Sequence, residues 1–188
     1  MKVIVRRTLS IVMCVAGLCL LLGQAFSGTR KQSKPERNWI FTPAAPFELD
    51  FGRGSGMVGL DTVAISEDGN AVLHRLGEHR QWVWATLRLS REQMRSIANM
   101  ITRRGLGSLQ NEYTPSFRVH DGTQWVLLIR QGDRRKSSYF DNSFPSAIRS
   151  FAADLDGMLR AAGSERLHWQ PIENGPREHE KLLWNSIR

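Results

Sequence analysis

Cysteine is almost missing from this 188-residue sequence: Cys14 and Cys19 are its only two thiols, and both lie in an apolar run near the N-terminus. Beyond that run, disulfides, thiol catalysis and cysteine metal sites are excluded, and stability must come from a packed core. Lipidation is not expected, because Met13 and Leu18 precede the cysteines where a lipoprotein signal has a small residue. We interpret both cysteines as small hydrophobic residues.

Sequence motifs of common enzyme and metal-site classes are also missing. Ser55 lies between two glycines but lacks the strand-to-helix context of a nucleophile elbow. His74, His79 and the pair His120-Asp121 would form a metal site only if two turns met at one edge, and no close-spaced histidine pair occurs. We predict no catalytic residue, no metal and no cofactor, and keep an enzyme with an unrecognised active site as the alternative.

The N-terminus has the layout of a secretory signal. Lys2, Arg6 and Arg7 precede the apolar run Ile11–Leu22, and Ala25-Phe26-Ser27 offers small residues before a cut at Gly28. Residues 8–29 carry no charge, and a helix of that length can cross a bilayer core of about 30 Å. Residues 1–27 are therefore predicted to be either a cleaved signal peptide or a retained signal anchor. Both alternatives predict export, to the periplasm or outside the cell, or a domain anchored to the membrane by residues 8–27.

The positive charge is smaller than the whole sequence suggests. The formal net charge is +8, but residues 1–27 contain three of the 26 basic residues and none of the 18 acidic ones, so cleavage would leave +5. An excess of this size favours solubility and weak attraction to anionic surfaces without identifying a partner. Nucleic acid is not expected as a partner of an exported chain.

Three further parts follow the leader. Residues 28–46 combine basic residues with prolines and show no periodicity, which predicts a flexible basic tether. Residues 47–163 are predicted to form the folded domain. Residues 164–188 are predicted to be a C-terminal tail, and its apolar residues either pack back on the domain or bind a partner.

In the first half of the domain, strands are predicted to precede a helix. Alternating apolar and polar residues place strands at 47–51, 62–66, 71–74 and 82–89, with a glycine-rich turn at 52–56 and a hairpin turn at Gly69. Ser90 and Gln93 have the spacing of a capping box, and Gly105 is placed to end the helix.

The second half repeats this plan. Strands are predicted at 116–119, 124–130 and 136–140, followed by a helix from Pro145 to Gly163. Its apolar stripe consists of Ile148, Phe151, Ala152, Leu155 and Leu159. Either a β-β-β-α unit is duplicated, or common turn and cap chemistry produces the same spacing. Both alternatives predict an α+β fold, an antiparallel sheet with two amphipathic helices on one face.

A series of turn and cap residues extends across residues 58–160. After the Asp-Gly hairpin turn it comprises Leu89-Ser90-Arg91-Glu92-Gln93, Gly107-Ser108-Leu109, Tyr113, Asp121 and Pro145. This order of hairpin, helix, meander and helix resembles a family of small exported bacterial domains of unknown function. The resemblance implies the fold class and export, and it implies no activity.

Two surface features are the candidate binding residues. Trp82 and Trp84 share one face of a predicted strand, where they either form a platform for a sugar ring or a protein partner or lie in the core beneath the helices. Arg134, Arg135 and Lys136, with Arg130 across the turn, either form a solvated turn or contact an anionic membrane or polymer surface. These features predict a non-enzymatic binding module of the cell envelope.

Overall fold

A computed structural model describes residues 39–55, 58–116, 122–172 and 178–187, except for the side chains of His79, Glu178 and His179. The chain divides into two units, residues 1–32 and 33–188, and every described residue belongs to the second. The predicted leader, residues 28–38 of the predicted tether and the pair His120-Asp121 lie outside the described residues. Among the helices that are described, none has the length and hydropathy needed to cross a membrane.

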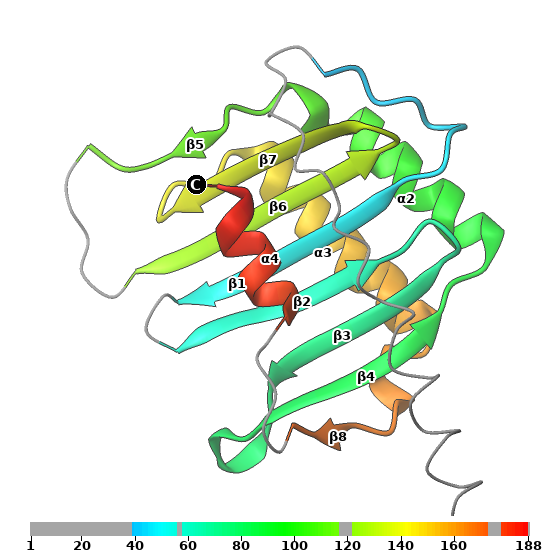
Figure 1. The fold of residues 1–188 in the computed structure, drawn as a ribbon, viewed down its shortest axis with the longest axis vertical. Coiled ribbons are helices and arrows are strands. Elements are labelled where there is room, and N and C mark those ends of the chain that lie inside the picture. The colour runs from blue at the N-terminus through cyan, green and yellow to red at the C-terminus, as the bar shows by residue number, and fades with distance from the viewer. Residues whose placement is uncertain (1–38, 56–57, 117–121, 173–177, 188) are drawn as a thin grey trace, which may run out of the picture. The chain divides into compact units, whose positions relative to one another are not determined.

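The domain is built on one eight-stranded sheet with the strand order β5-β7-β6-β1-β2-β3-β4-β8. The strands are β1 (Glu48–Ser55), β2 (Gly59–Ile65), β3 (Asn70–Leu76), β4 (Trp82–Arg88), β5 (Glu112–Tyr113), β6 (Thr123–Gln131), β7 (Arg134–Asp141) and β8 (Gln170–Pro171). All neighbours are antiparallel except β5 and β7. The predicted α+β class is confirmed, with a mostly antiparallel sheet (Figure 1).

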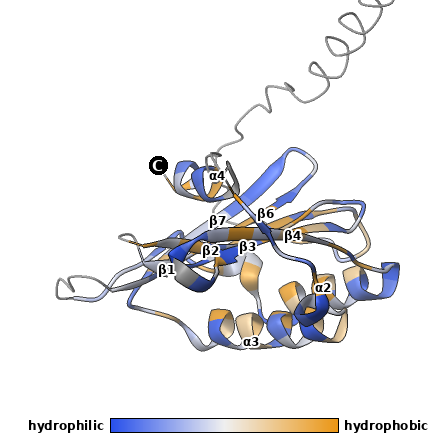
Figure 2. Ribbon diagram, turned by 90° about the horizontal axis from the view of Figure 1, so that it is seen from below, coloured by the Kyte–Doolittle hydropathy of each residue, from blue (hydrophilic) through white to orange (hydrophobic). Residues whose placement is uncertain are grey.

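Three α-helices and three short 3₁₀-helices complete the described fold. The α-helices are α2 (Arg91–Arg103), α3 (Ser146–Ala161) and α4 (Glu178–Ser186), and the 3₁₀-helices are η1 (Glu78–Arg80), η2 (Leu106–Ser108) and η3 (Ser164–Arg166). Figure 2 shows α2 and α3 on one side of the sheet and α4 on the other. We call these sides the two-helix face and the α4 face. The predicted capping box is confirmed, because the Ser90 and Gln93 side chains each bond the other residue's backbone N–H.

The main core lies between the sheet and the two helices. Leu49 and Phe51 of β1 and Leu127 of β6 point into it, and they are at most 1% exposed. The stripe predicted for the second helix is confirmed, since all five of its residues are buried on α3. Because successive strand residues point to opposite faces, alternate positions of β1 and β6 supply one continuous apolar layer.

The α4 face has a much smaller apolar cluster. Leu60, Val126 and Leu128 of the sheet surround Leu183 of α4, which is fully buried. A Cβ added at Gly52 would lie 2.7 Å from Leu183 Cδ1 and 2.9 Å from Leu60 Cδ1, so a larger residue here would force both leucine side chains to shift. The C-terminal segment therefore packs on the domain through α4.

Two segments predicted to be irregular belong to the packed structure. Residues 52–55, predicted as a glycine-rich turn, continue β1, because they pair with β2 on one side and β6 on the other. The predicted tether also ends earlier than residue 46: Trp39 is 3% and Phe41 9% exposed, and both belong to the main core. Aromatic burial outweighs the proline-rich composition here, so the packed domain includes residue 39.

The second predicted meander differs from the structure. β6 and β7 form its hairpin, whereas residues 117–119 of its predicted first strand lie outside the described residues. β5 and β8 were not predicted. Each has only two residues, too few to show alternation, and each is held by pairing with an edge of the sheet.

Candidate functional site

Trp82 and Trp84 lie on the α4 face and not beneath α2 and α3. The register of β4 against β3 pairs Trp82 with Leu76 and Trp84 with His74. Leu87 and Leu89, on the opposite face of the chain, pack against the main core instead. Both indoles are half-buried, so the predicted alternative in which they form the core is wrong.

His74 lies within the sheet, where it contacts the ring of Trp82 and is the strand partner of Trp84. Its ring stacks on that of Trp82, with centroids 4.8 Å apart and an angle of 13° between the planes. His74 is only 6% exposed, and Thr62, its partner on β2, is 2% exposed. The buried ring therefore restricts the orientation of Trp82, which reduces the entropy that this indole would lose on binding a ligand.

The short strand β8 adds polar atoms beside Trp84. Gln170 pairs with Trp84 across the edge of the sheet and is exposed, as is Thr86 two residues along β4. On the other face of the sheet, the Arg75 guanidinium lies 3.9 Å from the centre of the Trp169 ring. This contact holds Trp169, the residue immediately before β8. The site formed by Trp82, Trp84, Gln170 and Thr86, which we call the indole site, combines apolar rings with amide and hydroxyl groups.

The four predicted cationic residues do not form one patch. Arg130 donates to Glu48 at 2.6 Å and to Asp50 at 2.5 Å. Burial alone would lower the pKa of Arg130, but the attraction of Asp50 and Glu48 outweighs it and raises that pKa. The guanidinium is therefore charged, and two carboxylates of β1 neutralise it. Arg130 is therefore engaged by these carboxylates, and its predicted contact with an anionic surface is wrong.

Lys136 is the clearest departure from the predicted cationic cluster. It is 1% exposed, and its Nζ donates to Asn111 Oδ1 at 2.8 Å. Burial lowers the pKa of this amine. Arg134 is exposed and Arg135 half-buried, so the strand alternation separates Lys136 from the adjacent Arg135. Lys136 cannot contact a membrane or polymer surface in this fold.

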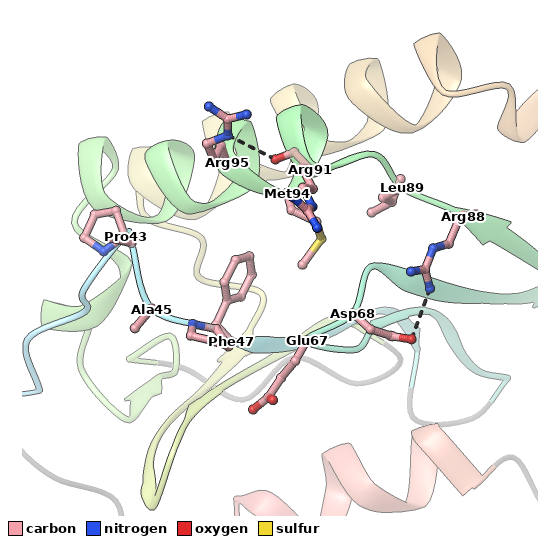
Figure 3. A pocket seen from close by; sticks show the side chains of 12 residues that line it. Pro43, Ala45, Phe47, Glu67, Asp68, Arg88, Leu89, Arg91, Met94 and Arg95 are labelled. Carbon is pink, nitrogen blue, oxygen red and sulfur yellow. Dashed lines mark hydrogen bonds and ion pairs between the residues drawn. The ribbon is translucent and has the colours of Figure 1, made fainter.

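A surface depression that the sequence did not indicate lies where β4 leads into α2. It has a volume of about 720 Å³ and is lined by three arginines, two carboxylates and an apolar floor. Its residues come from 43–47, the β2–β3 turn, the end of β4 and the first turn of α2 (Figure 3). Arg91 and Arg95 are four residues apart and share a helix face, which was visible in the sequence. That these two arginines lie close to residues 43–47 could not be predicted from the sequence.

A second depression lies on the outer surface between α2 and α3. Its volume is about 640 Å³, and it contains the ion pair between Arg104 and Asp154, whose atoms are 2.7 Å apart. Both charges are satisfied by each other, and exposed pairs of this kind contribute little free energy. Among the described residues, no three histidine, cysteine, aspartate or glutamate side chains are placed to hold a metal ion.

Comparison with known proteins adds no family to this description. The chain matches no model of a protein family and has no significant match among curated proteins.

Proposed function

We propose that this protein is a non-enzymatic binding module of the bacterial cell envelope that contacts a glycan or protein partner through the indole site. It is exported, and residues 1–27 are either cleaved or retained as a membrane anchor. A duplicated β-β-β-α unit, with its two helices on one face, is our proposal for the origin of the fold.

The observation that carries the proposal is the position of Trp82 and Trp84. Two half-buried indoles share the sheet face opposite α2 and α3, and the buried His74 ring supports one of them. Indole rings combine large apolar area with few rotatable bonds, which makes tryptophan frequent at binding hot spots. Gln170 and Thr86 supply polar atoms beside the rings, and this combination favours a sugar over a purely apolar ligand.

A binding experiment with Trp84→Ala tests the indole site. We expect the variant to bind insoluble peptidoglycan and soluble N-acetylglucosamine oligosaccharides about tenfold or more weakly, because the apolar stacking surface is lost. Affinity is measured by sedimentation for the polymer and by calorimetry for the oligosaccharides, after circular dichroism has verified folding.

Trp125→Ala is the matched control. Trp125 is also half-buried, but it packs against the main core from β6, which does not neighbour β4 or β8. The control should keep wild-type affinity. Equal affinity losses in the two variants, or unchanged affinity in Trp84→Ala, would contradict a glycan-binding indole site.

The mass of the protein isolated from its own cells tests where it works. We expect a mass that begins at Gly28 for a free exported domain and the full-length mass for an anchored one. Recovery of the full-length protein from the soluble cytoplasmic fraction would contradict both forms of the proposal.

A further inference from the structure

We propose that the arginine-lined depression at the start of α2 binds the headgroup and upper acyl chain of an anionic phospholipid. The site is separate from the indole site: it is formed by residues 43–47, the β2–β3 turn and the β4–α2 junction. The inference rests on the proposed membrane association, and it uses none of the residues that carry the glycan proposal.

The charges of the depression favour an anion. Arg88, Arg91 and Arg95 line it, together with Glu67 and Asp68. Asp68 forms an ion pair with Arg88, with 3.0 Å between Asp68 Oδ2 and Arg88 Nη1. Hydrogen bonds from Ser66 and Asn70, with the Arg88 contact, lower the pKa of Asp68 to about 2, so this carboxylate is ionised at neutral pH and offsets one arginine.

Arg91 and Arg95 provide the remaining positive charge. Both are exposed on the first turns of α2, and the Arg95 Nε donates to the Arg91 carbonyl oxygen at 3.4 Å. The terminal nitrogens of Arg95 take no part in that bond. In Figure 3 the Glu67 carboxylate points away from Met94 and Arg95. Arg91 and Arg95 both line the depression, with the Arg95 guanidinium turned away from Phe47 in Figure 3, and the fork geometry of a guanidinium is suited to a phosphate.

The floor of the depression is apolar, which distinguishes the site from a simple phosphate site. Phe47, Leu89 and Met94 line it with two prolines and two alanines. In Figure 3 the Phe47 ring and the Met94 side chain both point toward the space beneath the helix. A ligand with a phosphate for the arginines and a hydrocarbon chain for this floor satisfies both parts, and an anionic phospholipid has both.

The position of the depression in the chain favours a membrane phospholipid as its ligand. Its first lining residue is Pro43, and Trp39, four residues earlier, is already buried in the main core. Residues 28–38 connect this point to the apolar segment, and eleven residues extend at most about 40 Å. A retained anchor would therefore keep the depression within reach of the lipid headgroups.

Vesicle binding by the chain that begins at Gly28 tests the proposal without the apolar segment. Every residue of the described cores lies between 39 and 187, so this chain keeps the complete folded unit. We expect it to sediment with vesicles of equimolar phosphatidylglycerol and phosphatidylcholine but not with phosphatidylcholine alone. The double variant Arg91→Gln/Arg95→Gln should bind the anionic vesicles about tenfold more weakly.

Three further measurements distinguish a lipid site from general charge attraction. Arg149→Gln/Arg160→Gln removes the same charge from exposed positions of α3 and should change affinity less than about twofold. Met94→Gln keeps the charge and side-chain length but makes the floor polar, and should weaken binding several-fold. Inorganic phosphate should bind far more weakly than soluble dihexanoyl-phosphatidylglycerol.

The inference is overturned if the α3 double variant loses as much affinity as the α2 one, if Met94→Gln binds normally, or if inorganic phosphate binds as well as the short-chain lipid. Failure here would leave the indole site untouched, because Trp84→Ala is assayed with glycans. Failure of the glycan assay would likewise leave the vesicle result standing.

Discussion

The two faces of the sheet are stabilised in different ways. On the two-helix face, α2 and α3 cover a continuous layer of aliphatic and aromatic residues that includes Trp39 and Phe41. On the α4 face, three buried apolar residues of the sheet surround Leu183 of a nine-residue helix. Buried polar residues, among them Asp50, Thr62 and His74, also lie on this second face. The difference indicates that the two-helix face contributes most of the apolar packing of the domain, whereas the proposed indole site lies on the less strongly packed α4 face.

Adjacent leucines of β6 provide the sharpest test of this comparison. Leu127 points to the two-helix face and Leu128 to the α4 face, and they are 0% and 3% exposed. We expect Leu127→Ala to lower the free energy of unfolding by about 4 kcal/mol, because the surrounding core is large and relaxes poorly into the cavity. Urea denaturation followed by circular dichroism measures this loss.

Leu128→Ala should have a smaller effect, about 2 kcal/mol, since a short helix can move to fill the space. Hydrogen exchange should show faster exchange in α4 while the amides of α3 stay protected. Equal losses of stability in the two variants would show that the faces contribute equally and would end the comparison.

Lys136 is a buried charged residue on the otherwise apolar two-helix face. Its substitution is expected to have the smallest effect on stability. Its side chain lies on the same side of β7 as Phe140, a residue of the main core. We expect Lys136→Met to stabilise the protein by up to about 1 kcal/mol at neutral pH, because removing a buried cation relieves its desolvation.

The pH dependence of stability provides a second measurement of Lys136. Burial lowers the pKa of the folded amine below its value of 10.5 in the unfolded chain. Between those two pKa values the unfolded state binds more protons, so this residue makes stability rise with pH. The rise should be missing in Lys136→Met. Burial raises the pKa of Tyr139 and acts in the opposite direction, which is why the difference between wild type and variant is the informative quantity.

Local features of the fold were predictable from the sequence. The Ser90/Gln93 capping box, the Gly163 end of α3 and the apolar stripe of α3 depend on residues only a few positions apart. The same holds for the shared face of Trp82 and Trp84, which follows from strand alternation. Local hydrogen-bond chemistry and side-chain periodicity suffice for such predictions.

Features that depend on distant partners were not predictable in this way. Residues 52–55 have the composition of a turn, but pairing with β2 and β6 makes them strand. Lys136 has the sequence context of an exposed hairpin, but the approach of Asn111 buries it. The arginine-lined depression assembles residues from four segments, and no pattern within one segment reveals that they meet.

The amino-acid sequence by itself determined the α+β class, the helix caps and the near absence of cysteine, because each follows from composition or from neighbours along the chain. Only the tertiary structure decided which face each strand presents, that β1 lies between β2 and β6, and that Trp82 and Trp84 lie opposite the main core. The physical reason is that burial depends on contacts between distant residues, and a strand's alternation specifies two faces without saying which one the helices will cover.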